Sequence, residues 1–176
     1  MTNLGRKTSA VGRVILTQCA NVEGQLIDWL EEHDPLLAHL AMLVVYFWFG
    51  ALKLVGLSPA NPMVRSLQAK TLPFLSFEQF IVLFALFEML IGMLFLIPKT
   101  TRIAIVLFAA HMITTTMPLF LLPQMTWQRA LVPTMEGQYI IKNVVLIALA
   151  ANLGLSLRRG GRRSAPAGML SSEGAA

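Results

Sequence analysis

The stretch FEQFIVLFALFEMLIGMLFLI, residues 77–97, decides the fold because it has the length and apolarity of a membrane-spanning helix. Such a helix needs about 20 residues to cross a hydrocarbon core about 30 Å thick. Its middle is apolar apart from one carboxylate, Glu88. An acidic residue near the centre of a span costs about 2.5–3.5 kcal/mol on insertion scales. Glu88 therefore needs a partner, a water-filled cavity or a bound proton, and we expect the other spans to provide one.

The composition also indicates an integral membrane protein. Of the 176 residues, 56% are hydrophobic and 13% are charged, whereas soluble domains are about 45–50% apolar and about 25% charged. The net charge of +5 does not indicate nucleic acid binding, because no basic stretch is interleaved with aromatic residues. A single cysteine, Cys19, excludes an intramolecular disulfide and a CxxC redox pair. The three histidines are expected at different depths, so no metal site is predicted.

Three further apolar stretches, 35–55, 103–122 and 138–157, predict three more spans. The predicted fold is therefore all-α, a four-transmembrane-helix bundle over residues 35–157. Pro35 is expected in the first turn of its span, where the amide that proline lacks would be unpaired anyway. Pro118 predicts a kink, because its ring collides with the carbonyl four residues back. A short surface helix is expected within residues 58–70, after two helix-start signals.

Residues 1–34 and 158–176 are expected to flank the bundle on the cytoplasmic side. Apolar residues recur every three or four positions over 11–30, which predicts an amphipathic helix. We expect it to lie on the membrane surface or on the bundle rather than to bind a partner, since Trp29 suits an interface. The tail from 158 is basic and rich in small residues, and is expected to be disordered. No apolar stretch follows polar residues 1–10, so no cleavable signal peptide is predicted.

The basic residues predict the orientation. Nine lie in the N-terminal segment, the 98–102 loop and the tail, and three lie in the other two loops. Basic residues favour the cytoplasmic side, so both termini are expected in the cytoplasm, with the chain in the inner membrane and in contact with its lipid.

Polar side chains on all four spans are expected to face one outward-open pocket. Helical side chains lean toward the N-terminus of their helix, so Lys53 and Glu88 converge. His111 is either a third member of the site or a neutral histidine donating to a backbone carbonyl. Lys142 is expected to meet an anion, Glu78 or Glu136, or, like Lys53, to reach the head groups. The expected ligand-binding residues are Trp48, Lys53, Glu88, His111, Thr115, Tyr139 and Lys142.

Short motifs over residues 40–157 resemble those of DoxX-like membrane proteins, including the YkgB-type branch. They are WFGALK (48–53), SP (58–59), EMLIG (88–92), TTMP (115–118) and EGQYIIKN (136–143). Related sequences often carry Asp where this chain has Asn143, which leaves Lys142 less neutralised. The resemblance implies a four-helix bundle in the cytoplasmic membrane.

For function, the resemblance implies a redox-associated membrane protein. DoxX names a small subunit of a thiosulfate:quinone oxidoreductase, and relatives are associated with oxidative-stress defence. The pocket would then hold a quinone, without a covalent bond, or a small anion. The chain has no electron carrier or catalytic motif of its own, so a redox partner protein would supply electrons. The alternative is a non-enzymatic carrier or assembly factor. Four spans are few for a transporter, and a homo-oligomer would remedy this.

Overall fold

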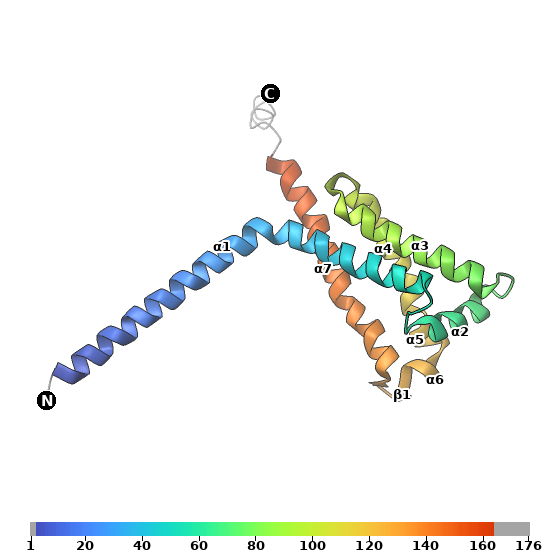
Figure 1. The fold of residues 1–176 in the computed structure, drawn as a ribbon, viewed down its shortest axis with the longest axis horizontal. Helices are drawn as coiled ribbons and strands as arrows, with labels where there is room; N and C mark the ends of the chain where they lie inside the picture. Colours follow the sequence, from blue (N-terminus) through green and yellow to red (C-terminus); the bar gives the residue numbers. More distant parts are fainter. Residues whose placement is uncertain (1–2, 164–176) are drawn as a thin grey trace, which may run out of the picture. The chain divides into compact units, whose positions relative to one another are not determined.

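The computed structural model describes residues 3–163, with side chains placed for 16–157, and its architecture is all-α as predicted (Figure 1). Four helical segments are long and apolar enough to cross a membrane: Leu16–Leu54, Phe77–Leu96, Pro98–Leu121 and Met135–Leu157. The chain is thus a multi-pass membrane protein. The expected span at 77–97 corresponds to helix α3, Phe77–Leu96.

Helix α1 is continuous over Asn3–Leu54 and contains Pro35 in its interior. The prediction that a span begins in a new helix at Pro35 is therefore wrong. Residues 31–34 contain no glycine or asparagine that would end the preceding helix. Instead, the His33 ring stacks on Trp29 with centroids 4.6 Å apart, and its Nδ1 lies 2.9 Å from the Trp29 carbonyl oxygen. These contacts bridge the helical turn before Pro35 and favour continuation.

Contacts within the chain divide it into two units, residues 1–37 and residues 38–176. In the second unit, α4 (Thr101–Thr116) packs against α3 and against α7 (Met135–Arg163). The apolar core of this unit takes residues from α1, α3, α4 and α7: Ala38, Met42, Tyr46, Ile91, Phe95, Ala104, Phe108, Met112, Ala150 and Leu153.

The third span is divided at Met117, next to the Pro118 at which the sequence predicts a kink. Helix α4 ends at Thr116, and the four-residue helix α5 begins at Pro118 and ends at Leu121. The Thr114 hydroxyl donates to the His111 carbonyl at 2.7 Å, and the Thr115 hydroxyl lies 3.2 Å from the same oxygen. Threonine hydroxyls thus bond to backbone carbonyls in the turn preceding the break.

The connections contain more regular structure than the sequence indicates. The predicted surface helix is α2, Asn61–Thr71, and the 98–102 loop contains a 3₁₀ turn, η1, at Pro98–Thr100. After α5, the chain forms α6 (Pro123–Thr126) and a small antiparallel hairpin of β1 (Trp127–Arg129) and β2 (Val132–Pro133). This segment lies between the spans predicted at 103–122 and 138–157, and its strands of two or three residues have too few positions to show alternation in the sequence.

Helix α7 continues to Arg163, so the expectation of a disordered tail from 158 is wrong for residues 158–163. The two glycines in RRGGRR cost about 1 kcal/mol each relative to alanine in a helix. The preceding turns already supply the costly nucleus, which makes extension by a few residues cheaper than a new helix. The rest of the predicted tail, 164–176, lies outside the described residues.

Candidate functional site

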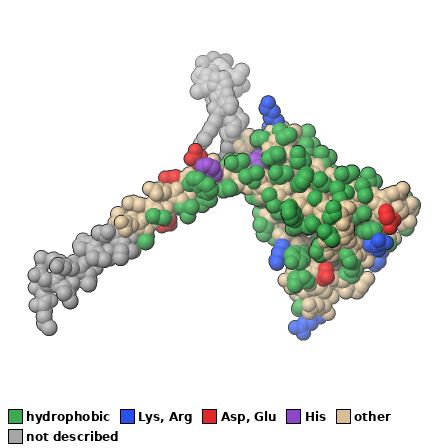
Figure 2. Space-filling view, viewed as in Figure 1, with side chains coloured by type: hydrophobic (Ala, Val, Ile, Leu, Met, Phe, Trp, Pro, Cys, Tyr) green, Lys and Arg blue, Asp and Glu red, His purple; other side chains and the backbone are tan. Residues whose placement is uncertain are grey.

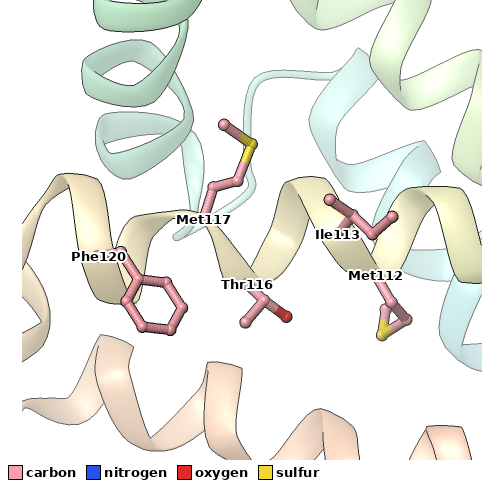
Figure 3. A pocket seen from close by; sticks show the side chains of 5 residues that line it. All are labelled: Met112, Ile113, Thr116, Met117 and Phe120. Atoms are coloured by element: carbon pink, nitrogen blue, oxygen red, sulfur yellow. The ribbon is translucent and has the colours of Figure 1, made fainter.

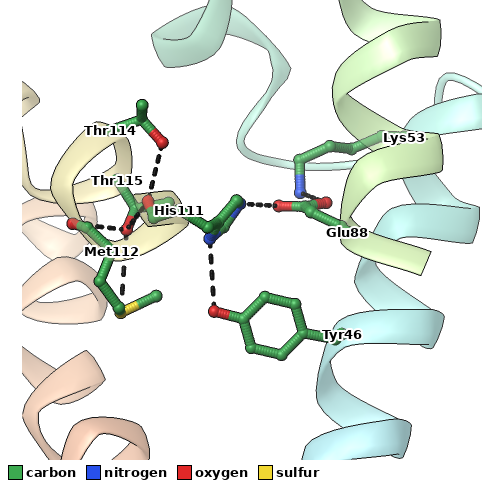
Figure 4. A network of polar contacts seen from close by, with 7 residues as sticks. All are labelled: Tyr46, Lys53, Glu88, His111, Met112, Thr114 and Thr115. Carbon is green, nitrogen blue, oxygen red and sulfur yellow. Dashed lines mark hydrogen bonds and ion pairs between the residues drawn. The ribbon is translucent and has the colours of Figure 1, made fainter. Parts of the chain in front are cut away.

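A buried ion pair joins α1 to α3 (Figure 4). The Lys53 ammonium donates to Glu88 Oε2 at 2.6 Å, and both side chains are only 7% exposed. This is the convergence that the lean of helical side chains predicts. Each charge makes the other tolerable where water is excluded, since an orphaned buried charge is very costly.

His111 of α4 connects this pair to Tyr46 of α1. Its Nε2 lies 3.1 Å from Glu88 Oε1, and its Nδ1 lies 3.3 Å from the Tyr46 hydroxyl. The contacts fit a neutral imidazole that donates from Nε2 to Glu88 and accepts from Tyr46 at Nδ1, and they also fit an imidazolium that donates from both nitrogens. The cluster of Tyr46, Lys53, Glu88 and His111, called the polar cluster below, sums to zero charge when His111 is neutral.

Two glycines allow α1 and α3 to approach closely enough for the ion pair to form. A Cβ on Gly50 would lie 2.9 Å from the Ala85 carbonyl oxygen, and one on Gly92 would lie 3.2 Å from the Leu43 carbonyl oxygen. Gly50 precedes Lys53 by about one turn, and Gly92 follows Glu88 by about one turn. Small residues at such positions are typical of close helix contacts in membranes. The local backbone approach therefore positions both charged side chains.

Aromatic rings complete the surroundings of the polar cluster. The Phe84 ring stacks on His111 with centroids 5.1 Å apart, and the Lys53 ammonium lies 5.7 Å from the centroid of the same ring. A cation within about 6 Å of a ring face is attracted by its quadrupole. The His111 imidazole is thus held on one face by Phe84 and at its edge by Glu88 and Tyr46.

A cavity of about 130 Å³ opens beside the polar cluster. All four long helices contribute to its lining, including Thr115 from α4 and Asn143 from α7. Pockets for drug-sized ligands are about 300–1,000 Å³, while a water molecule occupies about 30 Å³ of liquid. The cavity suits a few waters or one small polar ligand.

A larger hollow of about 460 Å³ lies where α4 ends and α5 begins (Figure 3). Its lining is apolar except for the Thr116 hydroxyl: Met112, Ile113, Thr116, Met117 and Phe120. Phe120 and Ile113 are exposed, which is expected of side chains that face lipid. Met112 also lines the smaller cavity, so the two hollows are neighbours.

The structure brings four of the seven predicted ligand-binding residues together and leaves three apart. Lys53, Glu88, His111 and Thr115 line the cavity. Trp48 and Tyr139 are 64% and 63% exposed and do not line it. Lys142 is exposed and lies with its Nζ 5.3 Å from the Tyr139 ring centroid. The ion pairs recorded among the described side chains both involve Glu88, and neither includes Lys142.

Two polar members of the site, Tyr46 and Asn143, were not among the predicted ligand-binding residues. Tyr46 lies seven positions before Lys53, two helical turns on the same face, so the helical stripe groups them. Nothing in the sequence pairs Tyr46 with His111, however, because that contact joins two helices. Asn143 lines the cavity from α7, one position beyond the predicted Lys142.

Among the described side chains, no group of three or more His, Cys, Asp or Glu comes together that could hold a metal ion. The molecule is thus a helical multi-pass membrane protein with a buried Lys–Glu–His–Tyr cluster at the contact of α1, α3 and α4. The chain matches no family model, no curated protein and no solved structure.

Proposed function

We propose that the chain is a DoxX-like, redox-associated subunit of the cytoplasmic membrane whose polar cluster binds a small ligand. The observation that carries the proposal is the position of Glu88, buried between Lys53 and His111 at 2.6 and 3.1 Å. The motif WFGALK contributes Gly50 and Lys53 to this contact, and EMLIG contributes Glu88 and Gly92. The residues that carry the resemblance therefore meet in space.

The cavity favours a small anion over a whole quinone. Its volume of about 130 Å³ lies below that of pockets for drug-sized ligands. With His111 neutral, a bare anion would add buried charge at considerable cost. Each negative charge of the ligand is offset by one proton taken up at Glu88 or His111. Thiosulfate, a sulfur oxyanion with two negative charges, has the required size and would enter with two protons, one on each of these residues.

Electron transfer in this proposal belongs to a partner protein. The chain contributes a binding site and a proton acceptor, and the partner supplies the electron carrier. Both termini face the cytoplasm in this proposal, because nine of the basic residues flank that side and three flank the other.

The test is calorimetric titration of the full chain in lipid nanodiscs with thiosulfate and, separately, with ubiquinone-1. We expect thiosulfate to bind, with about two protons taken up per dianion, measured by repeating the titration in buffers of different ionisation enthalpy. Glu88→Gln should weaken binding by about tenfold or more, because hydrogen bonds to charged groups contribute about 1.5–3 kcal/mol.

Lys142→Met is the matched control, since Lys142 is also a lysine within a span but does not line the cavity. It should leave the affinity for thiosulfate unchanged. If ubiquinone-1 binds and thiosulfate does not, the ligand is a quinone and not a small anion. Binding of neither, or equal losses in both variants, would remove the polar cluster as a ligand site.

A further inference from the structure

The first unit carries an apolar stripe that is exposed along the described part of its helix. Apolar side chains at helical spacing form it, with the half-buried His33 between the last two: Cys19, Val22, Leu26, Trp29 and Leu36. Val22 is 65% exposed and Leu26 is 55% exposed. Such spacing keeps the side chains on one side of a helix and is the pattern by which helices dock into grooves. Figure 2 shows apolar and acidic side chains on this part of α1.

The same segment is strongly acidic. Five carboxylates lie within 12 positions: Glu23, Asp28, Glu31, Glu32 and Asp34. No lysine or arginine occurs from 16 to 52, and Arg6, Lys7 and Arg13 all precede the stripe. An acidic residue at the centre of a span costs about 2.5–3.5 kcal/mol on insertion scales, so five of them place this segment outside the hydrocarbon.

The charge opposes two ways of covering the stripe, and the first of them is the membrane surface that the sequence analysis favours. Helices that lie on a membrane surface carry Lys and Arg on their polar face, because the cytoplasmic leaflet is negative. Five carboxylates would instead be repelled by it. Parallel pairing with a second copy would place five carboxylates beside five more, and like charges oppose such a match.

We propose that residues 16–37 dock, through this stripe, into an apolar groove with a basic rim on another protein. The contact buries the stripe and pairs the carboxylates beside it with lysines or arginines of the partner. At 3.6 residues per turn, Glu23 and Glu32 flank the stripe on opposite sides, whereas Asp28 and Glu31 lie on the far face. The rim contacts are therefore assigned to Glu23 and Glu32.

The experiment is photo-cross-linking in living cells from benzoylphenylalanine placed at position 26 of the full chain, in place of Leu26. This side chain is exposed, so the folded helix accommodates the larger group. We expect one discrete adduct with another protein, and mass spectrometry should locate the cross-link in a segment rich in lysine or arginine. An adduct of twice the chain's mass, or an adduct with lipid alone, would overturn the proposal.

Two double variants remove the same charge from opposite faces of the helix. E23Q/E32Q should lower the yield of the cross-linked product about threefold or more, since each exposed ion pair contributes about 0.2–1 kcal/mol. D28N/E31Q should leave the yield near that of the unmodified chain. Equal yields from the two double variants would overturn the assignment of a basic rim, whatever protein is captured.

Discussion

Gly92 of α3 lies directly against the backbone of Phe47 in α1: a Cβ on Gly92 would be 2.9 Å from the Phe47 amide nitrogen. A backbone atom cannot move aside as the end of a flexible side chain can. The two helices would therefore have to separate to admit even a methyl group. The same approach brings Lys53 within 2.6 Å of Glu88.

Gly92→Ala should accordingly destabilise the protein, by about 1–3 kcal/mol as for overpacked cores. It should also lower thiosulfate affinity if the polar cluster binds it, because separation of α1 and α3 lengthens the ion pair. Thermal unfolding in detergent measures the first effect. Gly154→Ala is the control, since its Cβ would meet only Ile105 Cδ1 at an ordinary 3.5 Å; a loss as large as that of Gly92→Ala would contradict the explanation.

Removing one partner of the buried ion pair should cost more than removing both. Glu88→Gln leaves the Lys53 ammonium without its carboxylate, and Lys53→Met leaves the carboxylate with His111 alone. Breaking a buried pair costs about 3–5 kcal/mol, and proton uptake by a stranded carboxylate reduces the figure. The double variant Lys53→Met, Glu88→Gln should be more stable than Glu88→Gln. Strictly additive losses in melting experiments would show that the two groups do not interact.

The two lysines of the spans should differ sharply in their effect on stability. Lys142 is exposed and lies over the Tyr139 ring, so Lys142→Met should change the free energy of unfolding by less than about 1 kcal/mol. Lys53→Met should exceed that loss, since Lys53 is buried. Parallel denaturation of the two variants in one detergent measures the difference. Similar losses would contradict the contrast in burial.

Thr134 should act as the N-terminal cap of α7. Its hydroxyl oxygen accepts from the Gly137 amide at 3.1 Å, and the same hydroxyl donates to the Met125 carbonyl at 2.7 Å. Thr134→Val removes both bonds at nearly constant shape and should cost about 0.5–2 kcal/mol. Thr134→Ser keeps the hydroxyl and should restore most of the stability. Equal melting temperatures for the valine and serine variants would argue against the cap.

The proposed orientation predicts which side of the membrane each connection occupies. In a Cys19→Ser background, a cysteine at Ala69 in α2 should react with an impermeant thiol reagent in intact cells, because this connection holds few basic residues. A cysteine at Ala165 should react only after permeabilisation. The reverse pattern would invert the topology and place the termini outside.

Much of the bundle could be predicted because each span is recognised from residues that are neighbours in the sequence. The apolar run of α3 and the break at Pro118 depend on residues adjacent in the chain, and both are present in the structure. The prediction that a helix begins at Pro35 failed because the sequence alone does not distinguish a proline at the start of a helix from one in its interior. The distinction depends on contacts such as the His33 stack on Trp29, which composition does not reveal.

The polar cluster could be predicted only in part. The contact of Lys53 with Glu88 could be predicted from the depth of each residue and the direction of its side chain, because both follow from helix geometry and position in a span. The rotation of each helix about its own axis does not follow from those quantities. It decides that Tyr46 meets His111 and that Lys142 lies over Tyr139 rather than in the cavity.

With His111 neutral, the zero net charge of the polar cluster also determines how the membrane potential acts on it. A potential of 100 mV does up to about 2.3 kcal/mol of work on each elementary charge carried across the membrane. Lys53 and Glu88, 2.6 Å apart, experience nearly the same potential, so the work on one cancels the work on the other. A membrane potential therefore does no net work when the pair moves as a unit, and it does not drive a ligand that arrives with protons balancing its charge. A bare anion in the same cavity would be driven by voltage, and its occupancy would depend on the membrane potential.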